Sequence, residues 1–275
     1  MPGDRRLRVA ARYAVLLLLA AAVLFPVYIT VVNSLLTPAR LSSRPPALFP
    51  AHPQWHNYAD AWTDGHLGRY VMNSFVVSVS ITVFQVVTAV LAAYAFSFLR
   101  FPLRGLLFVV FLATLMIPGE VTFFTNVDTI RSLGWYDTYA ALIVPFVATG
   151  FGAFLLRQSF MTVPGDLRDA AAIDGYGHWR FLGRVVVPLA RPAIGAMALF
   201  AFLGAWNQYL WPLVATKDER LRTVQIGLKA LAGSQLDKIA VTYAGTVLAF
   251  LPIAILLVIF SKQLVRGLMS GAVKG

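Results

Sequence analysis

The sequence predicts an all-α membrane protein with six transmembrane helices, and three observations lead to this class. The 275 residues are 59% hydrophobic and only 13% charged, which is too apolar for a soluble domain of this size. Six long stretches contain no Asp, Glu, Lys or Arg. In lipid, stretches of this length satisfy their own backbone hydrogen bonds as α-helices, and they lack the alternation of barrel strands.

The predicted spans follow one another along the chain. They are Tyr13 to Leu36, Tyr70 to Leu99, Gly105 to Gly119, Tyr139 to Leu156, Pro192 to Thr216, and Ile239 to Ser261. The third reaches spanning length only if its helix continues past Glu120 to Val127. The first run is too long for a signal peptide and five more follow, so we expect an uncleaved first helix.

The positions of Arg and Lys predict the orientation in the membrane. A net charge of +11 would suggest a nucleic-acid partner for a soluble protein, but in a membrane protein its distribution matters more. Fourteen of the 23 cationic residues lie on the inner side when the N-terminus is inside: Arg5, Arg6, Arg8, Arg12, Arg100, Arg104, Arg157, Arg168, Arg180, Arg184, Arg191, Lys262, Arg266 and Lys274. This asymmetry predicts that both termini are cytoplasmic.

The segment from Asp169 to Pro192 lies between two long apolar runs and contains several charged residues. Asp166 can cap a short helix there, and Gly175 can end that helix in the left-handed conformation. A second short helix is predicted from His178 to Val187, where Pro188 and Pro192 stop it. Helices of about two turns are marginal alone in water, so something must pack against them.

Two interpretations of this loop remain open from periodicity. It is either an amphipathic linker on the membrane surface or a docking element. In the second case Leu167, Ala170, Ala171 and Asp174 form one face of small residues that seats in a partner's cleft.

A family resemblance favours the docking element. The ordered set Asp169-Ala170-Ala171, Asp174-Gly175, Val185, Pro188 and Pro192 resembles the EAA coupling loop of ABC importer permeases. It is most similar to the carbohydrate-uptake, maltose-type family of binding-protein-dependent transport inner membrane components. Asp169 stands where that family usually has glutamate, which keeps the charge and shortens the reach. The resemblance extends to Asn57-Tyr58, Asn73-Ser74, Asp137-Thr138-Tyr139 and a short glycine-containing tail.

The resemblance implies a set of domains, partners and roles. It implies a basic cytoplasmic N-terminus (1–12), a six-helix permease domain (13–265) with a cytoplasmic coupling loop (161–192), and a cytoplasmic tail (266–275). The residues that would dock on an ATPase are Asp169, Ala170, Ala171, Asp174 and Gly175. The implied partners in a bacterial cell membrane are a second permease subunit forming a heterodimer, an ATPase dimer carrying ATP and Mg, an extracytoplasmic solute-binding protein, and a sugar. No cofactor is expected on this chain itself.

The fifth predicted span carries the candidate residues of a substrate pathway: Trp206, Asn207, Gln208, Tyr209 and Trp211. Amides in a membrane helix are costly without a partner, so we expect them to face the bundle or a wet cavity. Aromatic faces with a few polar groups suit a sugar. The alternative is that these aromatics pack the bundle and the partner subunit makes most sugar contacts.

Several other chemistries lack the residues they require. The spans hold no carboxylate, histidine or paired charge apart from Glu120, which argues against ion-coupled transport. The sequence has no cysteine, no H-E-x-x-H pair and no phosphate loop, so we expect no catalytic, metal or nucleotide site. The predicted function is import of a sugar with energy from a separate ATPase. The alternatives are a permease for a polyol, glycerol phosphate or polyamine, or a membrane enzyme or structural protein.

Overall fold

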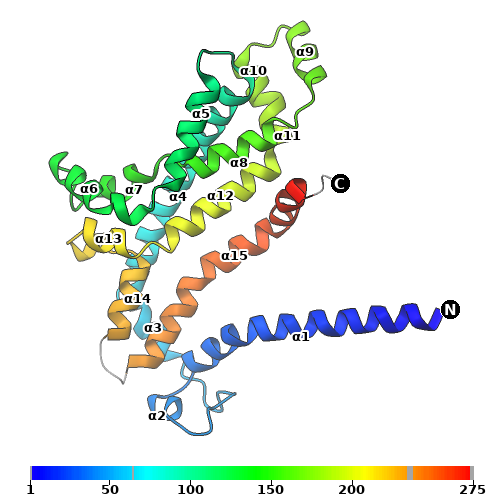
Figure 1. Ribbon diagram of the computed structural model, residues 1–275. Coiled ribbons are helices and arrows are strands. Elements are labelled where there is room, and N and C mark those ends of the chain that lie inside the picture. Colours follow the sequence, from blue (N-terminus) through cyan, green and yellow to red (C-terminus); the bar gives the residue numbers. More distant parts are fainter. Residues whose placement is uncertain (1, 64, 234–237, 273–275) are drawn as a thin grey trace. The chain divides into compact units, whose positions relative to one another are not determined.

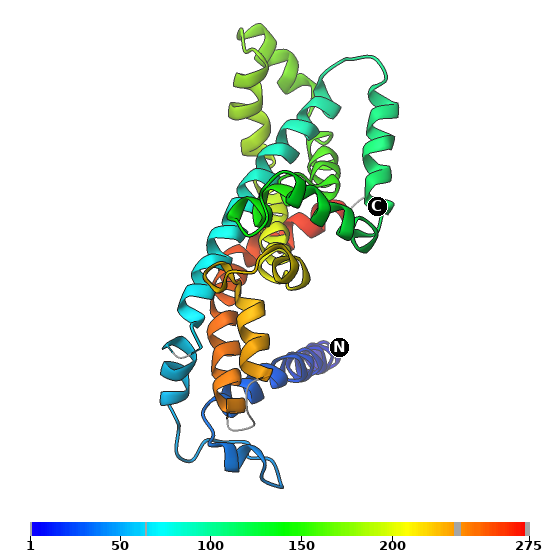
Figure 2. The ribbon, with the colours of Figure 1, turned by 90° about the vertical axis from the view of Figure 1, so that its left-hand side faces the viewer.

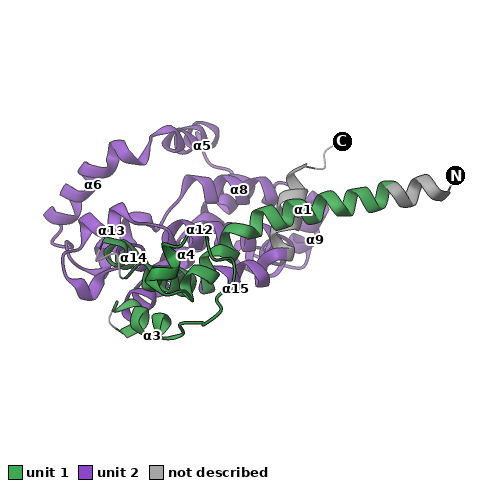
Figure 3. Ribbon diagram, turned by 90° about the horizontal axis from the view of Figure 1, so that it is seen from below, with its two compact units in different colours: residues 1–68, 227–251 green, residues 69–226, 252–275 purple. Residues whose placement is uncertain are grey.

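Every regular element in the described part of the chain is helical, which confirms the all-α class. The computed structural model describes residues 2–63, 65–233 and 238–272, and the side chains of 8–63, 65–233 and 238–261. Two compact units make up the chain (Figure 3). Unit 1 contains residues 1–68 and 227–251, and unit 2 contains residues 69–226 and 252–275.

Three continuous helices in the described residues are long and apolar enough to cross a membrane. They are α1 (Pro2–Ser34), α4 (Leu67–Phe98) and α15 (Ile239–Ala272). At most 22% of the most apolar window of each helix is buried inside the chain, so most of these side chains are at least partly exposed. Such surfaces suit lipid or another membrane subunit. The first, second and sixth predicted spans are therefore confirmed as helices.

The third and fourth predicted spans are bent helices. In the third, α5 (Arg104–Ala113) and η1 (Thr114–Met116) meet α6 (Gly119–Ser132) at 95°. In the fourth, α7 (Tyr139–Ile143) and η2 (Val144–Phe146) meet α8 (Gly150–Phe160) at 42°. Pro118 precedes α6 directly, where its fixed φ suits a helix start but its missing N–H interrupts the helix before it.

The prediction of one continuous fifth span from Pro192 to Thr216 was wrong. Helix α12 (Arg191–Trp206) ends at Trp206, and α13 (Leu210–Ala215) begins after three non-helical residues. Pro212 gives the reason, because its ring would clash with the carbonyl of Gln208 in an unbroken helix. The structure instead joins α12 to the preceding helical segment, 178–189, with a bend of 80°.

That preceding segment replaces the second short helix predicted from His178 to Val187. It consists of α10 (His178–Phe181), a π-helical stretch η3 (Leu182–Val186) and α11 (Val187–Leu189). Pro188 does not stop the helix, because it directly follows the π-helical stretch, and local π-helical adjustment allows a helix to accommodate a proline. The remaining helices are α2 (Pro38–Leu41), α3 (His56–Thr63), α9 (Gly165–Ile173), η4 (Glu219–Leu221) and α14 (Val224–Gly233).

In unit 1, a buried amide fixes α3 against the end of α1. The side chain of Asn57 donates hydrogen bonds to the carbonyls of Ser34 (2.9 Å) and Leu36 (3.2 Å). The hydroxyls of Ser34 and Tyr58 lie 2.6 Å apart. These bonds satisfy the free carbonyls at the end of α1.

Unit 2 has two apolar cores at different levels of α4. The ribbons of Figures 1 and 2 show α9 near one end of α4 and α13 farther along it. The core at the α9 end gathers Tyr94, Leu156, Phe160, Ala171 and Phe181. The core at the α13 end gathers Ile81, Val127, Leu142, Trp211 and Ala215. In the core at the α9 end, α8 packs closely on its neighbours, since a Cβ on Gly152 would lie 2.5 Å from Met197 of α12 and 3.2 Å from Ala89 of α4.

Some predicted features lie outside what the structure describes. The side chains of Arg5, Arg6, Lys262, Arg266 and Lys274 are outside the described residues, as is the end of the predicted tail (266–275).

Candidate functional site

The predicted docking helix is present as α9, with a start that differs from the prediction. Pro164, rather than Asp166, occupies the N-cap position, and Asp166 lies in the first turn without capping the helix through its side chain. A carboxylate there still interacts favourably with the positive end of the helix dipole. Because Pro164 sets the backbone turn at the start of the helix, Asp166 is not needed as an N-cap.

The end of α9 agrees with the prediction at Gly175. Its φ is +74°, which is the left-handed region. The N–H of Gly175 donates to the carbonyl of Ala172 (3.1 Å), and the N–H of Tyr176 donates to the carbonyl of Ala171 (2.8 Å). These two bonds form a Schellman motif, which satisfies the last carbonyls of the helix within the chain itself.

The predicted docking residues differ in exposure. Asp169, Ala170, Asp174 and Gly175 are exposed, whereas Ala171 is only 6% exposed and belongs to the core at the α9 end. The methyl group of Ala171 therefore packs on its own chain. It seats α9 on unit 2, and the exposed members of the set are the ones left free for a partner.

Sequence reasoning missed the two apolar side chains that this loop exposes most. Ile173 is 87% exposed at the end of α9, and Trp179 is 76% exposed in α10. Large apolar side chains among charged residues were the available signal. Exposed aromatic and aliphatic residues of this kind are typical anchors of protein interfaces.

A hydrogen bond joins this loop to α4. The hydroxyl of Tyr94 lies 2.9 Å from Nδ1 of His178, and the two rings meet edge to face. Tyr94 is 6% exposed, and its ring also contacts Phe98 and Phe181. A cavity of about 210 Å³ lies beside this pair, lined also by Arg168, Ala171 and Tyr176. The pair links the start of α10, and through it α9, to the end of α4 (Figure 1).

The candidate pathway residues lie around the break between α12 and α13, and they separate into two groups. Trp206 and Trp211 are buried and pack: Trp206 stacks on Phe202, and the indole N–H of Trp211 donates to the carbonyl of Ala141 (3.0 Å). Asn207 and Tyr209 are exposed, and Gln208 is half-buried. The packing interpretation thus describes the two tryptophans, and the three residues of the break remain the pathway candidates.

Gln208 reaches a cavity of about 250 Å³ within unit 2. The cavity also contacts two residues of α4, the start of α8, and the middle and end of α12. Its lining is Ile81, Gln85, Thr149, Phe151, Met197, Phe200, Ala201, Gly204, Ala205 and Gln208. Sequence reasoning missed Gln85, although an amide inside the second predicted span was an available signal; Thr149, Phe151 and Phe200 carry no comparable signal. The lining combines aromatic rings with neutral hydrogen-bonding groups and contains no charged residue.

Side chains of α4 satisfy the backbone at the nearby break between α7 and α8. Gln85 donates to the carbonyl of Phe146 (2.8 Å), and the hydroxyl of Thr88 donates to the carbonyl of Val147 (2.9 Å). Non-helical backbone at membrane depth is tolerated when neighbouring groups satisfy it or when it lines a cavity. This break therefore fits inside a membrane protein.

Comparisons with known proteins agree with this arrangement. Residues 85–270 match the family described as "Binding-protein-dependent transport system inner membrane component". The chain is 36% identical over 256 residues to the sn-glycerol-3-phosphate transport system permease protein UgpE of Pectobacterium atrosepticum, covering 90% of this chain and 91% of the relative. The UgpE protein of Brucella abortus (strain 2308) is 35% identical over 269 residues, with 94% of each chain covered.

A solved structure shares the fold. It is a bacterial ABC transporter involved in the import of the acidic polysaccharide alginate, with a TM-score of 0.81 and 23% identity. The match covers 94% of this chain and 97% of that chain.

Proposed function

The chain belongs to the family of binding-protein-dependent transport system inner membrane components, the permeases of ABC importers, and on this premise we propose how it works and what it carries. It is one subunit of a permease heterodimer in the bacterial inner membrane. An ATPase dimer docks on the cytoplasmic side and a solute-binding protein on the other. Six spans cross the membrane with both termini inside, as the arginine distribution favours; the fifth span is α12, and residues 178–189 before it stay on the cytoplasmic side with α9.

The substrate we propose is sn-glycerol 3-phosphate or a closely related polyol phosphate. The sequence alone favoured a sugar and kept glycerol phosphate as an alternative. The relatives that match over nine tenths of the chain are named as permeases for sn-glycerol 3-phosphate. Their sequence identity to this chain is the main support for the proposed substrate.

The cavity beside Gln208 supports a polyol as well. Gln85, Thr149 and Gln208 offer neutral donors and acceptors for hydroxyl groups, and Phe151 and Phe200 offer ring faces to carbon atoms. Because no charged side chain lines it, this cavity suits the hydroxylated part of the substrate. The phosphate is then held by groups outside this lining, such as those of the partner permease.

The α9 loop supplies the contact with the ATPase in this proposal. Ile173 and Trp179 are the exposed apolar anchors, Asp169 and Asp174 are the charged rim, and Ala171 and the Schellman turn hold the loop in shape. Tyr94 and His178 carry movement of the loop to α4.

Uptake into proteoliposomes that contain the whole complex tests the substrate. With ATP and the binding protein, radiolabelled sn-glycerol 3-phosphate should accumulate, and maltose should neither accumulate nor compete. Accumulation of maltose in place of the glycerol phosphate would show that the sugar assignment is the correct one.

Variants of the cavity amides test the pathway in the same vesicles. Gln208→Leu and Gln85→Leu should lower uptake several-fold, because each loses a polar group of the lining. Gln158→Leu is the matched control, since Gln158 is an exposed amide on α8 outside the cavity. Equal uptake by all three variants would remove the cavity from the pathway.

A further inference from the structure

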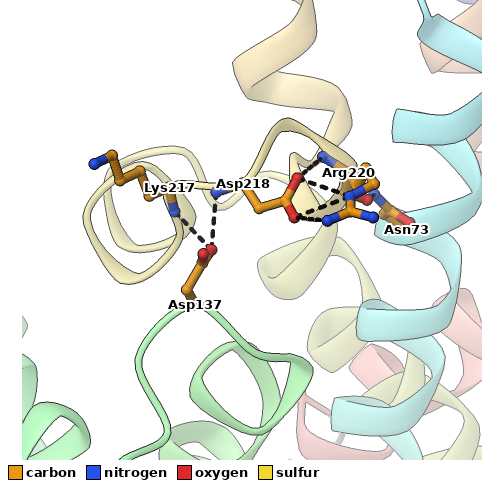
Figure 4. Close-up of polar contacts among 5 residues, drawn as sticks. All are labelled: Asn73, Asp137, Lys217, Asp218 and Arg220. Carbon is orange, nitrogen blue, oxygen red and sulfur yellow. Dashed lines mark hydrogen bonds and ion pairs between the residues drawn. The ribbon is translucent and has the colours of Figure 1, made fainter.

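The segment between α13 and α14, residues 217–223, is here called the outer connector. Asp137 holds its first residues: the carboxylate oxygen Oδ1 accepts hydrogen bonds from the N–H groups of Lys217 (2.8 Å) and Asp218 (2.9 Å), as Figure 4 shows. The N–H of Asp137 in turn donates to the carbonyl of Ala215 (3.0 Å). Asp137 has a φ of +63°, a conformation uncommon outside glycine, asparagine and aspartate.

Asn73 of α4 holds the other half of the connector. Its side-chain amide donates to the carbonyls of Arg220 (2.7 Å) and Arg222 (2.9 Å), and its oxygen accepts from the hydroxyl of Tyr139 (2.8 Å). Asn73 is only 5% exposed. The hydroxyl of the next residue, Ser74, accepts from the N–H of Val224 (2.8 Å). Buried side chains thus satisfy successive backbone groups of the connector.

Glu219 and Arg220 expose most of their charged side chains to solvent, whereas the side chains of their partners, Arg222 and Asp218, are about one-third exposed. The side chain of Arg220 is 74% exposed and pairs with Asp218 at 2.8 Å, and that of Glu219 is 68% exposed and pairs with Arg222 at 2.8 Å. Exposed ion pairs contribute little to stability. These charges are therefore available to a partner, while the shape that displays them depends on Asn73 and Asp137.

Both ends of the connector lead back to the break in the pathway. Helix α13 follows that break directly. At the other end, Gln225 of α14 places its amide nitrogen 3.4 Å from the carbonyl of Trp206 and 3.4 Å from the side-chain oxygen of Asn207. The connector is thus linked to Asn207 through α13 on one side and through Gln225 on the other.

We propose that Asn73 and Asp137 are positioning residues that keep the outer connector in the shape which a loaded binding protein engages to start transport. The inference rests on the proposed function, because it assigns the partner to that importer. Neither residue needs to touch substrate.

The first test measures the shape alone. The chain has no cysteine, so Lys217→Cys provides a single attachment point for a nitroxide on the connector. In the assembled complex the label should be immobile in the otherwise unchanged chain and in Asp137→Asn, which keeps the acceptor oxygen and tolerates a positive φ. It should become mobile in Asp137→Gly, which keeps the φ and loses the acceptor, and in Asn73→Asp, which loses both donors.

The second test measures the partner. The concentration of binding protein, loaded with sn-glycerol 3-phosphate, that half-stimulates ATP hydrolysis should rise about tenfold in Asp137→Gly, equivalent to ~1.4 kcal/mol of binding free energy. The maximal stimulated rate should stay the same, which a general loss of folded complex would not allow. Asp137→Asn should restore the lower concentration, and Asp128→Asn, at an exposed acid of α6, should leave it unchanged.

The outcomes separate the two proposals. An immobile label in Asp137→Gly and Asn73→Asp overturns the positioning role, as does a mobile label with an unchanged half-stimulating concentration. If Asn73→Asp does not fold, Asp137→Gly decides alone. Absence of stimulation in the unchanged complex, with the label immobile, overturns the proposed function and with it the assignment of the binding protein.

Discussion

The α9 loop and the outer connector are both short exposed segments of unit 2, but they are built in opposite ways. The α9 loop closes its backbone with local bonds of its own and exposes the apolar side chains Ile173 and Trp179. The connector has its backbone held by side chains from elements far away in sequence, and it exposes Glu219 and Arg220.

The difference indicates two kinds of contact. Apolar anchors give lasting attachment that salt affects little, whereas exposed charges favour fast and reversible encounters that salt weakens. An importer needs its ATPase continuously and its binding protein only once per cycle.

Gly175→Val should nearly abolish transport. At a φ of +74° a β-branched residue is strongly disfavoured, at a cost on the order of 1 to 3 kcal/mol. The Schellman turn should open and α9 should lose its position. Gly177→Val is the control, because Gly177 has φ −75° and open space around it. Uptake and permease content are measured together, and equal uptake by the two variants would contradict the importance of the turn.

Trp179→Ala should release the ATPase from the membrane complex. Loss of an aromatic anchor at an interface costs about 2 kcal/mol or more, so retention of the ATPase on the purified permease should fall at least tenfold. Retention by the unchanged protein should vary little with salt. Trp55→Ala removes another exposed tryptophan, in unit 1, and should retain the ATPase. If retention of the ATPase fell strongly with salt, the α9 loop and the outer connector would not differ in the kind of contact they make.

A pair of hydroxyl deletions should separate the two ends of unit 2. Tyr94→Phe removes the bond to His178, and Tyr139→Phe removes the bond to Asn73, each worth about 1 kcal/mol. The first should lower the amount of substrate moved per ATP, and the second should raise the half-stimulating concentration of binding protein. The same effect from both variants would mean that the ends are not independent.

Acid should loosen the connector only at low pH. The side-chain hydrogen bond from Arg220, followed by its backbone N–H, holds the pKa of Asp218 below the usual value. A lowered carboxyl pKa adds stability above the ordinary pKa of about 4, and this stability is lost as the pH falls through the lowered value. The label at Lys217→Cys should therefore keep its mobility from pH 8 to 5 and loosen slightly below about pH 4. Loosening near pH 6 would implicate another group.

Much of the fold follows from the sequence because lipid allows few backbone solutions. Long uncharged runs produced α1, α4 and α15, and the left-handed Gly175 follows from the pattern of a helix ended by glycine. The break at Asn207 was missed because the span was predicted from the absence of charged residues, and Pro212 carries no charge. That criterion does not consider the clash between the ring of Pro212 and the preceding helical turn.

The site was predictable only where it is contiguous in sequence. The docking residues fall within one loop, so their spacing was informative, although the burial of Ala171 depends on Tyr94 and Phe181 from other segments. The cavity around Gln85, Thr149 and Gln208 joins three distant segments, and the clasp of Asn73 on Arg220 joins two. Such meetings are set by tertiary packing, which one sequence without relatives does not reveal.

The same clasp sets an order on biogenesis. Asn73 and Ser74 meet partners 147 to 150 residues later in the chain. Bonds of such long sequence separation form late, after the intervening segments have been made and inserted. The polar side chains at the outer end of α4 therefore lack these partners until residues 220–224 have been synthesised. A chain truncated before residue 220 should contain the α9 loop but should be degraded by membrane proteases.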